Sequence, residues 1–174
     1  MKKQRIQAYI LKQEISSNDQ KSQEIFQTRN FGQRIGEKIH YSPSETLYLF
    51  EEKKLVVLKG NKKLSREELI KKLQRIDKKF QTKYPVFKDL RKKGYVVKTA
   101  LKFGAEFRVY PKGKNPDNSH AKWIVFTDKE TGRLSWHDFS AKNRVAHSTK
   151  KNLLIAVVDQ EGDVLYYEVK WLKP

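Results

Sequence analysis

Histidine is the first side chain to consider, because it titrates near neutral pH and can accept or donate a proton. The chain contains four of them: His40, His120, His137 and His147. None is spaced like a pair of zinc ligands, and no cysteine is present to complete such a site. A lone histidine most often has a structural role. His120 differs from the others because it ends a polar loop just before an apolar strand pattern, where a scaffold can present it to a substrate.

Carboxylates offer a second kind of chemistry. Glu168 and Lys170 form a Glu-x-Lys pattern that some sheet-based nucleases place on a strand, and Asp163 or Asp128 would have to complete a magnesium site. The same pattern is common by chance in a lysine-rich chain. We therefore expect no metal and no cofactor, and we keep a metal-dependent nuclease as an alternative.

Charge is the strongest global signal. There are 38 Lys and Arg residues against 20 Asp and Glu, which gives a net charge of +18. Such a surplus repels itself in a compact fold unless a polyanion shares its field. Nucleic acid is the usual polyanion, since neutralised phosphates release condensed counterions. A lysine-rich surface of the kind found in heat-adapted proteins is the alternative.

Composition also predicts the compartment. The absence of cysteine excludes disulfides and thiolate metal sites, and it fits a reducing cytosol. The basic N-terminus is not followed by an apolar run of signal-peptide length. No stretch approaches the roughly 20 apolar residues that span a bilayer. We expect a cytoplasmic protein with no membrane partner.

The elements that must position these side chains divide into two groups. In the first half, Ser42 with Glu45 and Ser65 with Glu68 form capping boxes that begin two helices. The second helix has an apolar face made of Leu69, Leu73, Ile76 and Phe80. Tyr84 precedes Pro85 and should break this helix. We therefore predict domains at 1–83 and 84–174.

The second half predicts a mixed sheet with helices. Strands are expected at 95–102, 106–110, 121–127, 153–158 and 164–172, and helices at 86–93 and 138–147. The run 153–158 is apolar without interruption, which is typical of a central strand buried on both faces. The fold class is α/β (α+β): a small mixed N-terminal domain and a C-terminal domain with a central mixed β-sheet flanked by helices.

Three segments of the second half become specific when taken together. They run from Gly94 to Tyr110 with a Phe-Arg-x-Tyr end, from Ser119 to Trp123, and from Arg144 to Leu154. In this order and spacing they resemble the archaeal tRNA-splicing (tRNA-intron) endonucleases, in their catalytic subunit. The resemblance covers about half of the chain, from Tyr84 onward.

The resemblance implies an enzyme that cuts precursor tRNA at bulge-helix-bulge sites without a metal. Its tyrosine falls on Tyr110, its histidine on His120 and its lysine on Lys151, with Lys150 as the neighbouring alternative. The tyrosine would be the base for the RNA 2′-hydroxyl, the histidine the acid for the leaving 5′-oxygen, and the lysine the positive charge. The products would be a 2′,3′-cyclic phosphate and a 5′-hydroxyl end.

The resemblance also implies how RNA is held and how subunits assemble. Arg144 matches an arginine that stacks on a bulged base, and Trp171 is the candidate for the opposite face, unless it is a core aromatic. A homotetramer or a heterotetramer with a related subunit is implied. Asp159, Glu161 and Asp163 fit an acidic loop that docks into a partner, or else form an ordinary turn. A non-catalytic RNA-binding subunit remains the other alternative.

Overall fold

The computed structural model describes residues 5–172 and divides the chain into two compact units. The first unit extends to Gln81 and the second begins at Thr82. The division falls inside helix α4, Phe80–Lys92. Within the described part of the chain, no helix combines the length and the apolar character that a membrane crossing requires.

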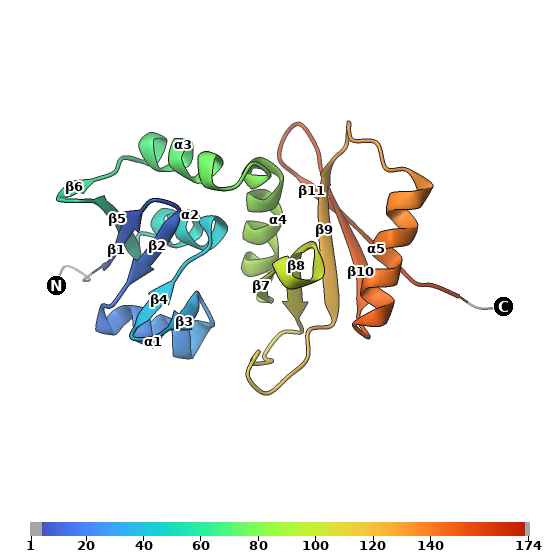
Figure 1. Ribbon diagram of the computed structural model, residues 1–174, viewed down its shortest axis with the longest axis horizontal. Helices are drawn as coiled ribbons and strands as arrows, with labels where there is room; N and C mark the ends of the chain where they lie inside the picture. The colour runs from blue at the N-terminus through green and yellow to red at the C-terminus, as the bar shows by residue number, and fades with distance from the viewer. Residues whose placement is uncertain (1–4, 173–174) are drawn as a thin grey trace. The chain divides into compact units, whose positions relative to one another are not determined.

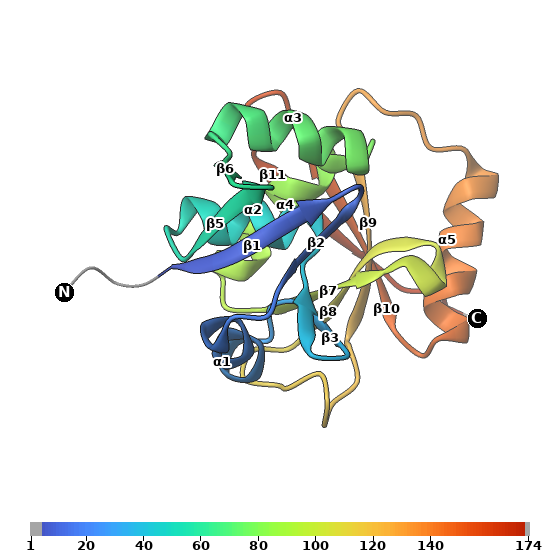
Figure 2. The same ribbon diagram turned by 60° about the vertical axis from the view of Figure 1, so that its left-hand side comes forward.

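The first unit is built on a mixed sheet. Its strands follow the order β3-β4-β2-β1-β5-β6. Alternate residues of β1 are buried, namely Ile6, Ala8 and Ile10, and β1 runs parallel to β5 beside it. Figure 2 shows the hairpin of β1 and β2 from the front. The elements of this unit are β1 Ile6–Leu11, β2 Glu14–Ser17, α1 Gln20–Arg29, β3 Gln33–Ile35, β4 Lys38–His40, α2 Pro43–Glu51, β5 Leu55–Lys59, β6 Lys62–Lys63 and α3 Arg66–Ile76.

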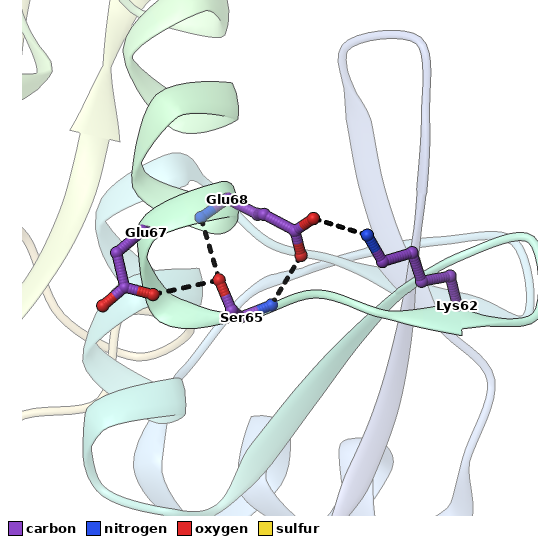
Figure 3. A network of polar contacts seen from close by, with 4 residues as sticks. All are labelled: Lys62, Ser65, Glu67 and Glu68. Carbon is purple, nitrogen blue, oxygen red and sulfur yellow. Dashed lines mark hydrogen bonds and ion pairs between the residues drawn. The ribbon is translucent and has the colours of Figure 1, made fainter.

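Both predicted capping boxes are present. At the start of α2, the Ser42 side chain accepts the N–H of Glu45, and the Glu45 carboxylate accepts the N–H of Ser42. At the start of α3, Ser65 and Glu68 make the same reciprocal pair. Figure 3 shows that Lys62 also bonds the Glu68 carboxylate and that the Ser65 hydroxyl bonds Glu67. These contacts satisfy backbone groups that a helix start leaves unpaired.

The second unit is a sheet between two helices. Its strand order is β11-β10-β9-β8-β7, in which β9 and β10 are parallel and the other neighbours are antiparallel. Figure 1 shows α4 on one face and α5 on the other. The elements that follow α4 are β7 Val96–Ala100, the 3-10 turn η1 Leu101–Phe103, β8 Ala105–Tyr110, β9 Trp123–Lys129, α5 Trp136–Ser148, β10 Asn152–Val158 and β11 Val164–Val169.

The α/β class and the mixed sheet are confirmed, and the predicted strands need small corrections. The first one ends at Ala100, because residues 101–103 turn as a 3-10 helix. The last one ends at Val169 rather than Leu172. The helix before β10 begins at Trp136, two residues before the predicted start, because Ser135 caps it through the N–H of Asp138.

The predicted helix break at Pro85 is wrong. Pro85 lies inside α4, and α3 ends at Ile76, so Phe80 begins a new helix instead of extending α3. Proline removes one hydrogen bond from a helix interior, which costs about 3 kcal/mol. Burial of Val86, Phe87 and Leu90 on the same helix offsets this cost. Phe87 packs against Phe107 of β8, with ring centroids 5.9 Å apart.

A polar contact ties α4 to the edge strand of the sheet. The Tyr166 hydroxyl donates to the Asp89 carboxylate over 2.7 Å, and Lys93 bonds the same carboxylate over 2.7 Å. The Lys93 ammonium also lies 5.2 Å from the centre of the Tyr166 ring. Burial raises the pKa of Tyr166, and the hydrogen bond to Asp89 adds to this effect. The phenol therefore stays protonated and keeps donating.

We expect Ser65→Ala to lower the free energy of unfolding by about 1 kcal/mol at neutral pH, because it removes the side-chain cap of α3. Part of the difference should vanish in acid. The Glu67 N–H and the Ser65 hydroxyl hold the pKa of Glu67 below its usual value, so this contribution is present above the unfolded-state pKa. It is lost as the pH falls through the lower folded-state pKa. Urea unfolding at several pH values measures it.

Ser65→Thr is the matched control, because threonine also caps helices. It should keep most of the stability at neutral pH. A Ser65→Ala protein as stable as the wild type would show that the cap contributes nothing.

Candidate active site

Three chain segments meet at one edge of the second sheet. β8 ends at Tyr110, whereas β9 begins at Trp123 and β10 begins at Asn152. Because β8 is antiparallel to β9, and β9 is parallel to β10, the end of β8 and the beginnings of the other two share an edge. Figure 1 shows the loop 111–122 and the turn 149–151 at this same end.

Backbone hydrogen bonds join the three segments in a row. The Lys122 N–H donates to the Val109 carbonyl over 2.9 Å, and the Asn152 N–H donates to the Lys122 carbonyl over 2.9 Å. Tyr110 follows Val109, His120 comes two residues before Lys122, and Lys151 precedes Asn152. The fold therefore gathers the backbone of all three predicted catalytic residues at one edge.

Tyr110 is a buried side chain with only 3% of its surface exposed. Arg108 is paired with Ile124 across β8 and β9, and Ile124 belongs to the core that includes Ala146 of α5. Tyr110, two residues after Arg108, therefore lies on the α5 face of the sheet. Among residues 5–172, no group hydrogen-bonds its hydroxyl. The phenol is enclosed, yet its oxygen remains available to a partner.

His120 is exposed and precedes the buried Ala121. The Lys122 N–H bond to Val109 holds the second end of its loop, and cation–π contacts lie at both ends. At the start, the Lys112 ammonium lies 5.2 Å from the centre of the Tyr95 ring, and at the end the Lys122 ammonium lies 4.5 Å from that of Trp123. The two rings meet edge to face at 5.7 Å. The loop is thus held at both ends, and His120 faces solvent near the second one.

Lys151 is half-buried at the junction of α5 and β10. Its N–H donates to the Ala146 carbonyl over 2.9 Å, and its ammonium donates to the Thr149 carbonyl over 2.8 Å. The ammonium also lies 5.7 Å from the centre of the Phe103 ring. Phe103 packs on the core beneath α5, so Lys151 and Tyr110 lie on the same face of the sheet. The neighbouring Lys150 is exposed and has a left-handed backbone, with φ at +54°.

The two predicted RNA-binding residues are associated with the C-terminal part of α5. Arg144 is exposed on this helix. Trp171 has 64% of its surface exposed, and its ring meets the ring of His147 edge to face at 4.7 Å. His147 lies three residues after Arg144, so both neighbour each other on the helix surface. Trp171 is therefore a surface aromatic and not a core residue.

The acidic turn lies at the opposite end of the sheet, between β10 and β11 (Figure 1). Asp159 is used inside the turn, where its carboxylate accepts the N–H of Asp163 over 2.8 Å. The side chains of Glu161 and Asp163 are exposed, and within the described residues they have no ion pair. The turn therefore presents two free carboxylates, with Asp159 as the residue that shapes it.

The carboxylates of the metal alternative are spread over the sheet. Glu168 accepts a hydrogen bond from the Asn152 side chain and is paired with Leu154. Asp128 is paired with Val157, three positions further along β10, and Asp163 lies at the other end of β11. In the range 5–172, no three His, Cys, Asp or Glu side chains form a group that could hold a metal ion.

Sequence reasoning missed two features of this edge. Arg108 lies against Tyr110, with its guanidinium carbon 6.0 Å from the ring centre. The pair of Tyr95 and Trp123 anchors the loop that carries His120. Arg108 could have been found, because a cation two residues before a buried strand tyrosine must share its face. The aromatic pair depends on strand pairing, which no local pattern reveals.

Both halves of the chain match families of known proteins. Residues 80–166 match the family model described as tRNA intron endonuclease, catalytic C-terminal domain, and residues 6–70 match the one described as tRNA intron endonuclease, N-terminal domain. A tRNA-splicing endonuclease of Thermococcus onnurineus is 42% identical over 158 residues, which cover 91% of each chain.

Two further relatives, both called tRNA-splicing endonuclease, support the same assignment. One from Pyrococcus horikoshii is 39% identical and covers 98% of this chain and 99% of its own. One from Methanothermobacter thermautotrophicus is 39% identical over 83% and 84% of the two chains. The similarity extends through both units and includes the edge where the three segments meet, and the chain therefore belongs to the tRNA intron endonuclease family of enzymes.

Proposed function

We propose that this protein excises introns from precursor tRNA by metal-independent cleavage at bulge-helix-bulge sites. The observation that carries the proposal is the meeting of three segments at one sheet edge, joined through the peptide groups of Lys122. Tyr110 is the base, His120 the acid, and Lys151 the positive charge. Tyr110 and Lys151 share one face of the sheet, and His120 belongs to the same edge.

The reaction uses the nucleophile that RNA carries. Tyr110 acts as its phenolate, which the nearby Lys151 ammonium favours. The phenolate oxygen takes the proton of the 2′-hydroxyl, and the 2′-oxygen forms a bond to the adjacent phosphorus. The bond from phosphorus to the 5′-oxygen breaks, and His120 gives that oxygen a proton. The products are a 2′,3′-cyclic phosphate and a 5′-hydroxyl end, with no water consumed. Lys151 stabilises the charge that builds up on the phosphate oxygens.

The environments of the three side chains suit these roles. Tyr110 is enclosed, so charges near it act with less screening than in bulk water. Its phenol oxygen has no hydrogen-bond partner in residues 5–172 that would have to be displaced before the phenolate accepts a proton. His120 is exposed, where it can recover a proton from solvent after each cycle. Lys151 has one of its three donors occupied by the Thr149 carbonyl, which leaves two for phosphate oxygens.

We propose that Arg144 and Trp171 hold a bulged base by stacking on its two faces. Trp171 meets His147 by an edge contact and is largely exposed, so its ring has a face available for a base. Arg144 is exposed on the same helix, three residues before His147. A guanidinium and an indole are both flat groups that stack on nucleobases.

We also propose a tetramer, as four copies or as two copies with two related subunits, in which the acidic turn docks into a basic pocket of a partner. Glu161 and Asp163 supply the docking charges, and Asp159 fixes the turn. Carboxylates exposed together in a chain of net charge +18 suit a basic partner surface.

Purified protein should cleave an intron-containing precursor tRNA in excess chelator and leave cyclic phosphate ends. His120→Ala should lower the single-turnover rate about 100-fold or more, because a general acid contributes this much. Lys151→Met should also lower the rate, because it removes the charge that stabilises the transition state. His120→Ala should leave the affinity for RNA almost unchanged. Gel electrophoresis of the reaction products gives both the cleavage rate and the chemical nature of the product ends.

Lys150→Gly is the matched control, because glycine suits the positive φ of that position and removes a neighbouring ammonium. Its rate should equal the wild-type rate. A wild-type rate in His120→Ala would refute the assignment of the acid. Activity that requires added magnesium would favour the metal-dependent alternative. Activity that appears only with a second subunit and is unchanged by His120→Ala would favour a non-catalytic role.

Trp171→Ala should weaken RNA binding, because stacking contributes about 1–3 kcal/mol per base. Trp136→Ala is the control: this residue is 83% exposed and begins α5, far along the helix from His147, which Trp171 contacts. Binding is measured with a precursor RNA that carries 2′-deoxy sugars at the cleavage positions, so that cleavage does not interfere. Equal affinities for the two variants would remove Trp171 from the site.

The pair of changes Glu161→Gln and Asp163→Asn should convert tetramers into smaller species at moderate salt, while Asp159 keeps the turn. The reason is the loss of charge attraction to a basic pocket. Light scattering measures the mass. Asp117→Asn is the control, because it is an exposed change in the loop 111–122, at the opposite end of the sheet. A double variant with the wild-type mass would exclude the turn from assembly.

A further inference from the structure

The guanidinium of Arg108 is an unsatisfied group beside Tyr110. Its Nε atom is buried and has no hydrogen-bond partner among residues 5–172. No ion pair of its guanidinium exists within the same part of the chain. A buried charged donor without an acceptor destabilises a fold, and each such group in a native protein calls for an explanation. An acceptor supplied by a ligand is one such explanation.

No carboxylate of β8 or β9 pairs with Arg108. Across β8 and β9, Arg108 lies opposite Ile124, which offers no acceptor. Its guanidinium carbon lies 6.0 Å from the centre of the Tyr110 ring, which offers no carboxylate. Glu106, two residues earlier, uses its carboxylate to accept the N–H of Thr127 over 3.1 Å. The acceptor for Arg108 therefore has to come from outside the described chain.

The position of Arg108 indicates what that acceptor is. Arg108 and Tyr110 lie on the same face of β8, because two residues separate them. On the proposed function, the phosphate that is attacked lies against the Tyr110 hydroxyl. A guanidinium presents several N–H groups in a planar fork, which matches two oxygens of one phosphate.

We propose that Arg108 binds the RNA phosphate that lies against Tyr110. The proposal rests on the proposed function only in placing that phosphate beside Tyr110. Arg108 is then a binding residue of the site, and the phosphate supplies the acceptor that its guanidinium lacks within residues 5–172. Without RNA, the contact with the Tyr110 ring is a cation–π pair that keeps the guanidinium turned toward the phenol.

The test compares Arg108→Met with the wild type, using the precursor RNA with 2′-deoxy sugars at the cleavage positions. Affinity is measured at several salt concentrations. Arg108→Met should bind the RNA at least about tenfold more weakly than the wild type, because it loses a hydrogen bond between charged groups. The slope of log affinity against log salt should fall by about 1, because one phosphate contact is lost. Arg108→Lys should keep the slope and bind with intermediate affinity.

Arg133→Met is the matched control, since Arg133 is an exposed arginine in the connection from β9 to α5, at the opposite edge of the sheet. Its affinity and slope should match the wild type. Thermal unfolding of Arg108→Met should show a midpoint equal to or above that of the wild type, because an unsatisfied donor has been removed. A purely structural Arg108 would give the reverse: a lower midpoint with unchanged affinity and slope.

Two outcomes overturn the proposal. One is an Arg108→Met protein that folds and binds with the wild-type affinity and slope. The other applies if Arg108→Met does not fold. In that case, the proposal is overturned if Arg108→Lys binds RNA as tightly as the wild type does. Neither outcome touches the proposed function, which is tested separately by whether the wild-type protein, together with a related subunit where one is needed, cleaves precursor tRNA in chelator. A wild-type chain that binds without cleaving, together with the lower slope for Arg108→Met, would leave a phosphate site without the reaction.

Discussion

The backbone of one residue, Lys122, organises the proposed active site. The N–H of Lys122 is bound to the end of β8, and its carbonyl is bound to the start of β10. Through these two bonds, segments that are far apart in sequence become neighbours. The pairing register also decides faces, because a shift by one residue would move a strand side chain to the other side of the sheet. Tyr110 and Lys151 share a face only because this register is kept.

Local signals in the sequence were sufficient for some features and insufficient for others. The capping boxes at Ser42 and Ser65 were predictable, because each depends on residues within one helical turn. The helix through Pro85 was not predictable. The burial of Val86 and Phe87 offsets the energetic cost of the proline, and this burial arises from the tertiary fold. Propensity is a weak prior where such packing decides.

The candidate site shows the same limit. The positions of Tyr110, His120 and Lys151 followed from a resemblance, and the sequence placed each near a strand end. Their environments could not be predicted. The contact of Lys151 with Phe103 needs the 3-10 turn after β7, and the enclosure of Tyr110 needs the layer beneath α5. Net charge likewise counted Arg108 as one cation among many and did not reveal that its Nε is buried.

The burial of Tyr110, the proposed general base, bears on which RNA can react. Under the proposed assignment, a 2′-hydroxyl has to reach a phenol that is almost fully covered, at the rim of a sheet. A nucleotide stacked inside a regular A-form helix keeps its 2′-hydroxyl in a shallow groove and its phosphate in the helical backbone. A bulged nucleotide can rotate out of the stack and bring its sugar to such a rim. On this assignment, the burial of Tyr110 selects against regular duplexes, and the exposed Arg144 and Trp171 suit a nucleobase that has left its stack.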